Sequence, residues 1–168
     1  VDRGNAYPTF AESRFMAYDV IAHGAKGILY WGSTELKSNE CRQSIYALIS
    51  ELAALNPFLI APNEPGVKLQ VIGLTEELPG YGVRMFVRRA GDDLLLALIN
   101  EDDVPRMDVE ISGLNAIEGR DLHALYTGEI QRVSGGEAIV RLQSKEVKVY
   151  CTSRTYESPR RDHRDYAG

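Results

Sequence analysis

The sequence predicts an α/β segment followed by an all-β domain. In the first third of the chain, two stretches with apolar residues at helical spacing flank one short, continuous apolar run of strand length. From residue 67 onward, short apolar runs recur between turn residues, which is typical of antiparallel β domains. Pro57, Pro62 and Pro65 mark the connection between the two patterns, so a domain boundary is expected near residues 62–66.

The composition restricts the partners of the chain. Its 168 residues are 44% hydrophobic and 26% charged, which is typical of a globular protein with one or two cores. A formal net charge of -5 provides no broad basic surface, which argues against nucleic acid as a partner. No apolar run approaches the roughly 18 to 20 residues of a membrane span, so no membrane contact is expected. Cys41 and Cys151 have no second Cys or His at ligand spacing, and the sequence therefore predicts neither a metal site nor a disulfide framework.

A first helix is predicted over residues 10–23. Thr9 and Glu12 form a capping-box pattern, in which each side chain bonds to the backbone amide of the other residue. Gly24 follows His23 and suits the left-handed conformation that ends many helices. One face of this helix is apolar, through Ala11, Phe15, Tyr18 and Ala22.

The apolar run Ile28-Leu29-Tyr30-Trp31 does not alternate with polar residues, which predicts a strand covered on both faces and hence a parallel sheet. A second helix is predicted from Cys41 to Leu55, because apolar residues recur at helical spacing until Asn56-Pro57. Helix, strand, loop and helix form the repeating unit of α/β barrels and doubly wound sheets. One strand and two helices cannot bury a parallel sheet, so the missing strands are expected from elsewhere. Together with the start at Val1, this suggests a piece of a longer protein.

The second part of the chain predicts an antiparallel β-sandwich. Eight short strands are expected, over residues 67–73, 82–89, 94–100, 106–112, 121–127, 129–134, 137–143 and 146–152. The organisation predicted for the chain is a terminal βα unit, a β-sandwich and a flexible tail or linker, over residues 1–61, 62–152 and 153–168. The tail is expected to be flexible because it has no aliphatic side chain larger than alanine.

Two segments resemble the last turns of glycoside hydrolase (β/α)8 barrels, namely PTFAESRFMAY at residues 8–18 and HGAKGILYWG at residues 23–32. The resemblance implies helix seven, strand eight and helix eight of such a barrel, followed by the C-terminal all-β domain that many of these enzymes carry. It implies hydrolysis of an O-glycosidic bond, with no cofactor. The implied partners are a carbohydrate substrate and the missing N-terminal part of the barrel.

The same resemblance implies that the chain lacks its own catalytic carboxylates. In these barrels, two carboxylates at the ends of strands four and seven flank the glycosidic bond. Strand four is absent here, and strand seven would end at or before Val1. Trp31, at the end of strand eight, is the predicted sugar-stacking residue, although it could instead pack at the rim of the core. Glu35 in the following loop is expected to hydrogen-bond a sugar hydroxyl or to be a solvated acid, and Asp2 and Arg3 would lie close to the cleft or in a frayed end.

Other polar residues have simpler interpretations. The capping box accounts for Glu12, and we expect a structural role for Arg14 as well. His23 is more simply explained as a partner of the helix dipole than as a general base. The acidic run Glu101-Asp102-Asp103 could bind calcium through oxygen ligands, but it lacks the spacing of a calcium loop and is interpreted as a solvated turn.

Two alternatives remain open at this point. Residues 67–152 could be a non-catalytic module that binds carbohydrate or braces a barrel; the available rings, Tyr81, Phe86, Tyr126 and Tyr150, are scattered rather than arranged as a platform. A barrel enzyme of another class is the other alternative, because fold does not determine chemistry. A phosphate-binding barrel would require a glycine-rich turn after strand eight, which Gly32-Ser33-Thr34-Glu35 matches poorly.

Overall fold

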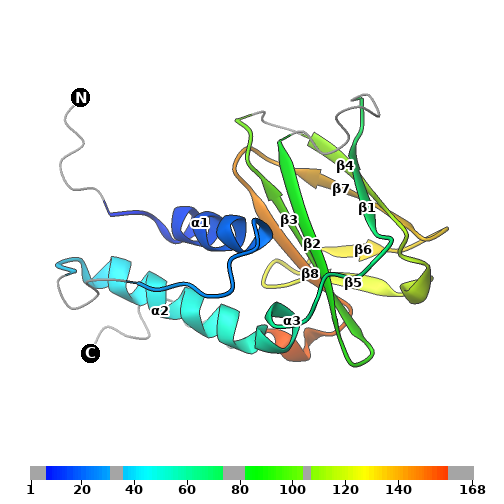
Figure 1. Ribbon diagram of the computed structural model, residues 1–168. Helices are drawn as coiled ribbons and strands as arrows, with labels where there is room; N and C mark the ends of the chain where they lie inside the picture. The colour runs from blue at the N-terminus through cyan, green and yellow to red at the C-terminus, as the bar shows by residue number, and fades with distance from the viewer. Residues whose placement is uncertain (1–6, 31–35, 74–81, 104–106, 159–168) are drawn as a thin grey trace.

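The computed structural model describes residues 7–30, 36–73, 82–103 and 107–158. The chain forms three layers, with helices packed on one face of a five-stranded sheet and a three-stranded sheet on the other face (Figure 1). The helices are α1 (Phe10–Ala22), α2 (Asn39–Ala54) and the short α3 (Asn56–Leu59). Within the described ranges, none of these helices has the length and apolar character needed to span a membrane.

Side-chain caps determine where the long helices begin. The predicted capping box at the start of α1 is confirmed, because Thr9 Oγ1 accepts from the Glu12 amide at 3.2 Å and the Glu12 carboxylate accepts from the Thr9 amide at 2.8 Å. At the end of α1, Gly24 adopts φ +96°, a conformation that glycine tolerates best. Ser38 caps α2 by accepting from the Cys41 amide at 3.1 Å.

Strands are present at all eight predicted positions, and these eight are the strands of the described residues. The five-stranded sheet has the order β2-β3-β8-β5-β6 and the three-stranded sheet the order β1-β4-β7, with every pairing antiparallel. A two-residue turn at Gly91-Asp92 joins β2 and β3, as the sequence indicates. The strands are β1 (Lys68–Val71), β2 (Val83–Ala90), β3 (Asp93–Asn100), β4 (Met107–Ser112), β5 (Asp121–Ala124), β6 (Ile130–Arg132), β7 (Glu137–Leu142) and β8 (Val147–Cys151).

Strand β3 is buried on both of its faces. Leu94, Leu96 and Leu98 point into the core between the two sheets, where they join Val109 and Ile111 of β4. The alternate residues of β3 point into a second core between the sheet and the helices, formed with Tyr18, Ile21, Leu55 and Phe58. The helices and the β-strands therefore share one of the two cores, while the boundary near residues 62–66 stays a prediction.

A buried ion pair joins the two long helices to the sheet. Arg14 Nε donates to Glu51 Oε1 at 2.8 Å, and the Tyr18 hydroxyl donates to the same oxygen at 2.7 Å. Arg14 Nη1 also donates to the backbone carbonyl of Val147 in β8 at 2.8 Å. Only 3% of the Glu51 side chain and 13% of the Arg14 side chain are exposed. These three bonds connect α1, α2 and β8 at one point.

The predicted strand at residues 28–31 is not present in residues 28–30, and Trp31 lies outside the described residues. Leu29 is 83% exposed, while Ile28 and Tyr30 are half-buried beside the helices. A strand requires hydrogen-bonding neighbours, and no described strand runs beside this segment. The prediction of a strand covered on both faces is therefore wrong for these residues in this structure.

The expected flexible tail is ordered in its first part. Residues Arg154–Tyr156 form a single 3-10 turn, and the Tyr156 ring packs edge-on against Phe58 at a centroid distance of 4.6 Å. The Ser158 amide donates to the Tyr126 hydroxyl at 3.1 Å. The expectation counted only aliphatic side chains, whereas an aromatic ring supplies the apolar contact here.

Replacing Glu51 by Gln is expected to lower the free energy of unfolding by about 3 to 5 kcal/mol, because it leaves the buried Arg14 guanidinium without a counter-charge. Chemical denaturation followed by circular dichroism measures this change. The matched control is Asp121→Asn, which removes an exposed partner 3.6 Å from Arg132 and should cost less than about 1 kcal/mol. Equal losses in the two variants would contradict a special role for the buried pair.

Candidate functional site

The two residues predicted to contact a sugar, Trp31 and Glu35, lie outside the described residues, as do Asp2 and Arg3. The segment that leads to Trp31 is described as far as Tyr30. This segment leaves α1 at Gly24 and returns along the helix layer between α1 and α2 (Figure 1). It is the described segment that directly precedes Trp31 in the sequence.

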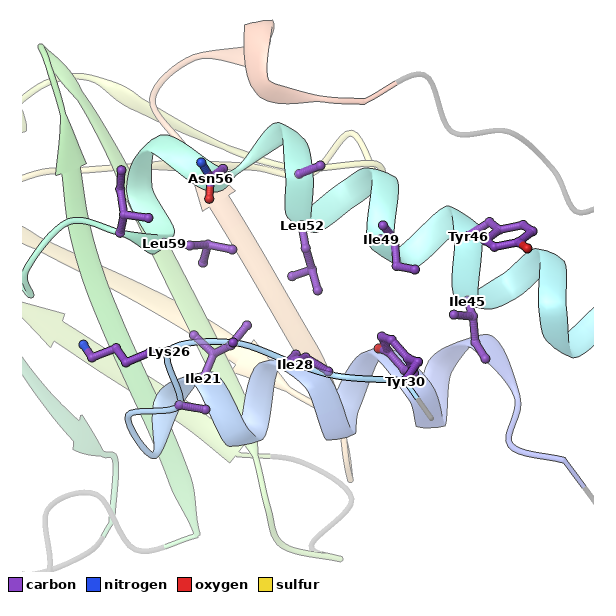
Figure 2. A pocket seen from close by; sticks show the side chains of 14 residues that line it. Ile21, Lys26, Ile28, Tyr30, Ile45, Tyr46, Ile49, Leu52, Asn56 and Leu59 are labelled. Carbon is purple, nitrogen blue, oxygen red and sulfur yellow. The ribbon is translucent and has the colours of Figure 1, made fainter. Parts of the chain in front are cut away.

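A pocket of about 510 Å³ lies between this segment and the helices (Figure 2). Ile45, Ile49 and Leu52 project from α2 toward the segment, which contributes Ile28 and Tyr30. Its polar lining groups are the Lys26 ammonium, the two phenols of Tyr30 and Tyr46, and the Asn56 amide. Burial raises the pKa of Tyr30, so its hydroxyl stays protonated at neutral pH and can donate a hydrogen bond.

The described lining of this pocket has no acid pair for hydrolysis. None of the described residues that line it is acidic, whereas cleavage of a glycosidic bond requires two carboxyl groups. Residues 26–30 form no backbone hydrogen bond with another described residue. Leu29 and Ile60 beside it are 83% and 77% exposed. The described segment before Trp31 thus combines exposed apolar side chains with a backbone that has no backbone partner among the described residues.

The buried carboxylate of Glu51 has structural partners. Glu51 is bound by Arg14 and Tyr18, which confirms the structural role expected for Arg14. Burial is the largest single effect and lowers the pKa of Arg14, but the charge of Glu51, the interaction with Tyr18 and the hydrogen bond to Glu51 together outweigh it, so the pKa is raised. Burial and the nearby Glu51 charge raise the pKa of Tyr18 well above its usual value, so this phenol remains a donor. Arg14 and Glu51 are far apart in the sequence, and no local pattern signals their pairing.

The acidic run after β3 does not converge on one point. Asp102 Oδ1 accepts from the Asp103 amide at 2.6 Å, while Asp103 pairs with Lys145 at 3.6 Å. Glu101 pairs instead with Arg84 at 3.1 Å. Because the three carboxylates have different partners, the interpretation as a turn fits better than a calcium loop.

His23 occupies the C-cap of α1, and its Nδ1 lies 3.0 Å from the Asp19 carbonyl oxygen. The predicted pairing of His23 with the negative end of the helix is therefore confirmed. The Asp19 carboxyl, which sequence analysis did not single out, faces Glu101. Burial first, and then hydrogen bonding to Glu101 and its charge, raise the pKa of Asp19.

Both cysteines are buried free thiols. Burial raises the pKa of Cys41, and it raises the pKa of Cys151 to about 11. A thiol with a raised pKa is protonated at neutral pH and is a poor nucleophile. Neither cysteine is therefore a candidate for covalent catalysis.

No protein-family model matches the chain, and no curated protein matches it significantly. Solved structures do match. A noncanonic maltogenic alpha-amylase from Thermotoga neapolitana is 14% identical with a TM-score of 0.54, and the match covers 82% of this chain and 36% of that one. An alpha-amylase from Geobacillus thermoleovorans, solved with acarbose, is 13% identical with a TM-score of 0.52, and the match covers 84% of this chain and 33% of that one.

An Anoxybacillus alpha-amylase is 19% identical with a TM-score of 0.44, covering 66% of this chain and 22% of that one. The chain therefore spans between about a fifth and about a third of the length of these three structures. At these identities the similarity concerns the fold. The structural neighbours of this β-rich chain are glycoside hydrolases.

Proposed function

We propose that the chain is the C-terminal part of a glycoside hydrolase that cleaves O-glycosidic bonds. In this proposal α1 is helix seven of a (β/α)8 barrel, residues 28–31 form strand eight, and α2 is helix eight. The two facing antiparallel sheets are the C-terminal β-sandwich of that enzyme.

One observation carries the proposal. The matches to the two amylases with TM-scores above 0.5 cover 82% and 84% of this chain. Residues 62–168 make up less than two thirds of the sequence. The matches must therefore include part of the helical layer as well as the β-strands. A similarity limited to a common β domain would not extend that far.

The exposed apolar surface around the segment before Trp31 supports the barrel assignment. Ile49, Tyr46 and Leu29 are 43%, 45% and 83% exposed beside backbone groups that have no described partner. In a parallel barrel, neighbouring strands would satisfy that backbone and adjoining elements would cover these side chains. Strand eight would then form from the segment that is not a strand here.

Within this proposal, the chain contributes to substrate binding rather than to acid–base chemistry. Trp31 would form one wall of the sugar site at the C-terminal end of strand eight, and Glu35 would hydrogen-bond a sugar hydroxyl. The two catalytic carboxylates would come from the preceding part of the barrel. No cofactor is required by this reaction.

A non-catalytic accessory module remains the second hypothesis. Phe86 and Tyr150 are 2% and 0% exposed, so these two rings offer no surface on which a sugar could stack. Tyr126 is partly buried and bonded to Ser158. The bracing version of this hypothesis, in which the β-strands only support a barrel, is therefore better supported than a carbohydrate-binding platform.

Backbone hydrogen exchange tests the barrel assignment. The amides of residues 28–30 should exchange rapidly in the 168-residue chain and become protected in a longer protein that carries the other barrel strands. A local opening free energy of about 3 kcal/mol corresponds to roughly 150-fold slower exchange. The amides of β8 serve as the control and should be protected in both proteins. Equally rapid exchange of residues 28–30 in the longer protein would contradict the proposal.

The isolated chain is expected not to hydrolyse aryl glycosides, because binding residues cannot replace a missing acid and nucleophile. A panel of nitrophenyl glycosides measures this. Turnover that survives repurification and is lost in Glu35→Gln would show that a catalytic carboxylate lies within the chain.

In the complete enzyme, Trp31→Ala should lower kcat/KM by roughly 5- to 150-fold, which is about 1 to 3 kcal/mol of lost ring contact. A Trp that only packs in the core would behave differently. Its truncation would cost about 3 to 5 kcal/mol of folding stability and leave the kinetics of the folded enzyme nearly unchanged. Measuring both Tm and kcat/KM distinguishes the two roles, and a large fall in Tm with normal kinetics would contradict sugar contact.

A further inference from the structure

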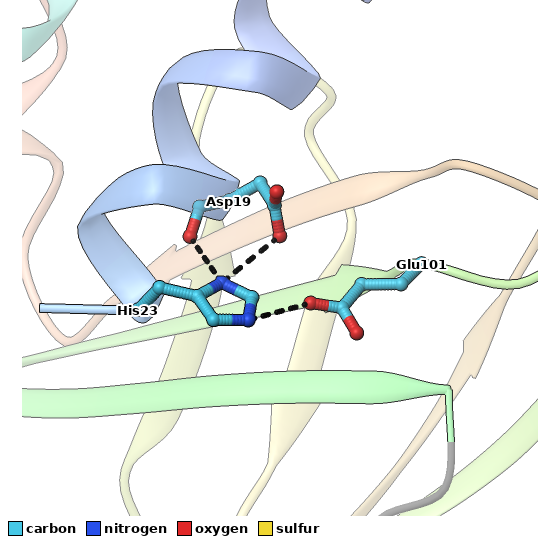
Figure 3. A group of neighbouring side chains, drawn as sticks. All are labelled: Asp19, His23 and Glu101. Atoms are coloured by element: carbon cyan, nitrogen blue, oxygen red, sulfur yellow. Dashed lines mark hydrogen bonds and ion pairs between the residues drawn. The ribbon is translucent and has the colours of Figure 1, made fainter.

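His23 lies between two carboxylates at the C-terminal end of α1 (Figure 3). Asp19 is one helical turn earlier, on the same face, and Glu101 directly follows β3. One potential ligand atom from each of the three residues lies within 4.8 Å of the other two. Two acids and an imidazole thus meet from elements that are distant in the sequence.

The His23 ring is oriented by the helix backbone. Its Nδ1 lies 3.0 Å from the Asp19 carbonyl oxygen, which can only accept a hydrogen bond. Nδ1 therefore carries the proton, and in the neutral ring the lone pair is on Nε2. Histidines that bind metals commonly donate their other ring N–H to a backbone carbonyl or a carboxylate in this way.

The lone pair of Nε2 faces a second acceptor. Nε2 lies 3.4 Å from Glu101 Oε1. A neutral ring nitrogen and a carboxylate oxygen repel each other unless a proton or a cation lies between them. Two ligands of a tetrahedral zinc ion, each about 2.0 to 2.2 Å from the metal, are themselves about 3.4 Å apart. The separation of Nε2 and Oε1 matches that spacing.

The Asp19 carboxyl, whose side chain is 28% exposed, is the second acid of the cluster. Its Oδ1 is shielded from solvent and accepts no hydrogen bond from the described residues. The His23 ring lies beside it, with Nδ1 at 3.4 Å from Oδ1. A buried carboxylate oxygen without a hydrogen bond is costly unless another species compensates its charge.

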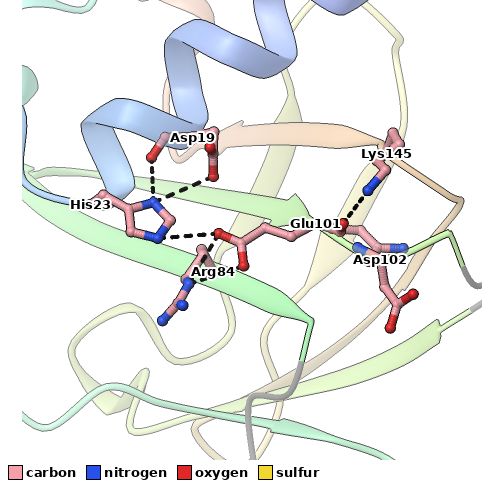
Figure 4. A network of polar contacts seen from close by, with 7 residues as sticks. Asp19, His23, Arg84, Glu101, Asp102 and Lys145 are labelled. Atoms are coloured by element: carbon pink, nitrogen blue, oxygen red, sulfur yellow. Dashed lines mark hydrogen bonds and ion pairs between the residues drawn. The ribbon is translucent and has the colours of Figure 1, made fainter.

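The surrounding charges hold Glu101 in place without neutralising the cluster (Figure 4). Arg84 Nε contacts Oε1 and Oε2 of Glu101 at 3.1 and 3.2 Å, and the Lys145 ammonium donates to the Glu101 backbone carbonyl. When both carboxyls are ionised and His23 is neutral, the two carboxylates and Arg84 give the cluster a net negative charge. A divalent cation is therefore attracted, against competition from Arg84.

We propose that Asp19, His23 and Glu101 bind a Zn²⁺ ion, through one oxygen of each carboxylate and Nε2 of His23. Imidazole and carboxylate ligands suit zinc, whereas magnesium and calcium favour sites made only of oxygen. The ion ties the end of α1 to the end of β3 and leaves one coordination position open. The sequence predicts no metal site because the spacing of Asp19 and His23 supplies only two ligands, and the third follows β3.

Isothermal titration of the 168-residue chain with zinc chloride tests this site. One ion should bind per chain and raise the Tm. His23→Gln and Glu101→Gln should each weaken binding by more than about 10-fold, since even a lost outer-sphere partner costs that much in many metal sites. His23 is half-exposed, and circular dichroism and the metal-free Tm establish that each variant is folded.

The other two histidines provide matched controls. His123→Gln and His163→Gln should each retain the single zinc site, and a tenfold excess of magnesium should not displace the ion. No zinc binding by the unaltered chain, unchanged binding by His23→Gln, or loss of the site in His163→Gln would overturn the proposal. The titration requires no sugar or catalytic activity, so its outcome is independent of the proposed glycosidase function.

Discussion

The arrangement of the helices on the sheet depends on the Glu51 carboxylate. Removing a carboxylate and a guanidinium from water costs several kcal/mol per ion, which only good geometry and further hydrogen bonds offset. Here one oxygen accepts from both Arg14 and Tyr18, and the second arm of Arg14 reaches the Val147 carbonyl. These bonds are directional, whereas the apolar contacts around them tolerate sliding. The pair therefore sets the position of α1 and α2 relative to β8.

The position of α1 and α2 affects the whole chain because β3 is buried on both faces and one of these faces is covered by the helices. Leu95, Ala97 and Ile99 face the helices, and each is fully buried. Without the helix layer, this face of the sheet would be an extended apolar surface in water. The helices and strands are thus coupled energetically, although their sequence patterns differ. The segment of residues 26–30 lies against this helix layer, and it forms no backbone hydrogen bond with another described residue.

Most of the fold could be predicted because its signals are local. Buried and half-buried side chains alternate along β4, a two-residue turn lies at Gly91-Asp92, and a capping box begins α1. Each of these features depends only on residues close together in the sequence. The strand predicted for Ile28-Leu29-Tyr30 is not present. Apolar composition indicates that a segment should be buried, but it does not indicate which strands will pair with it. The pairing of Arg14 with Glu51 and the approach of Glu101 to His23 join distant parts of the chain, so no spacing rule contains them. The sugar site at Trp31 and Glu35 rests on resemblance alone and stays a prediction, because both residues lie outside the described residues.

The orientation of α1 depends on its polar contacts, because its apolar residues do not form a single stripe along the helix. Tyr18 and Ile21 are buried against the sheet, whereas Met16 and Val20 are 50% and 42% exposed. A helix with apolar side chains on more than one face is poorly oriented by burial alone. The buried bonds of Arg14 and the contacts between His23 and Glu101 tie the two ends of α1 to β8 and to the end of β3. With its rotation fixed by these polar contacts, α1 presents Met16 and Val20 outward.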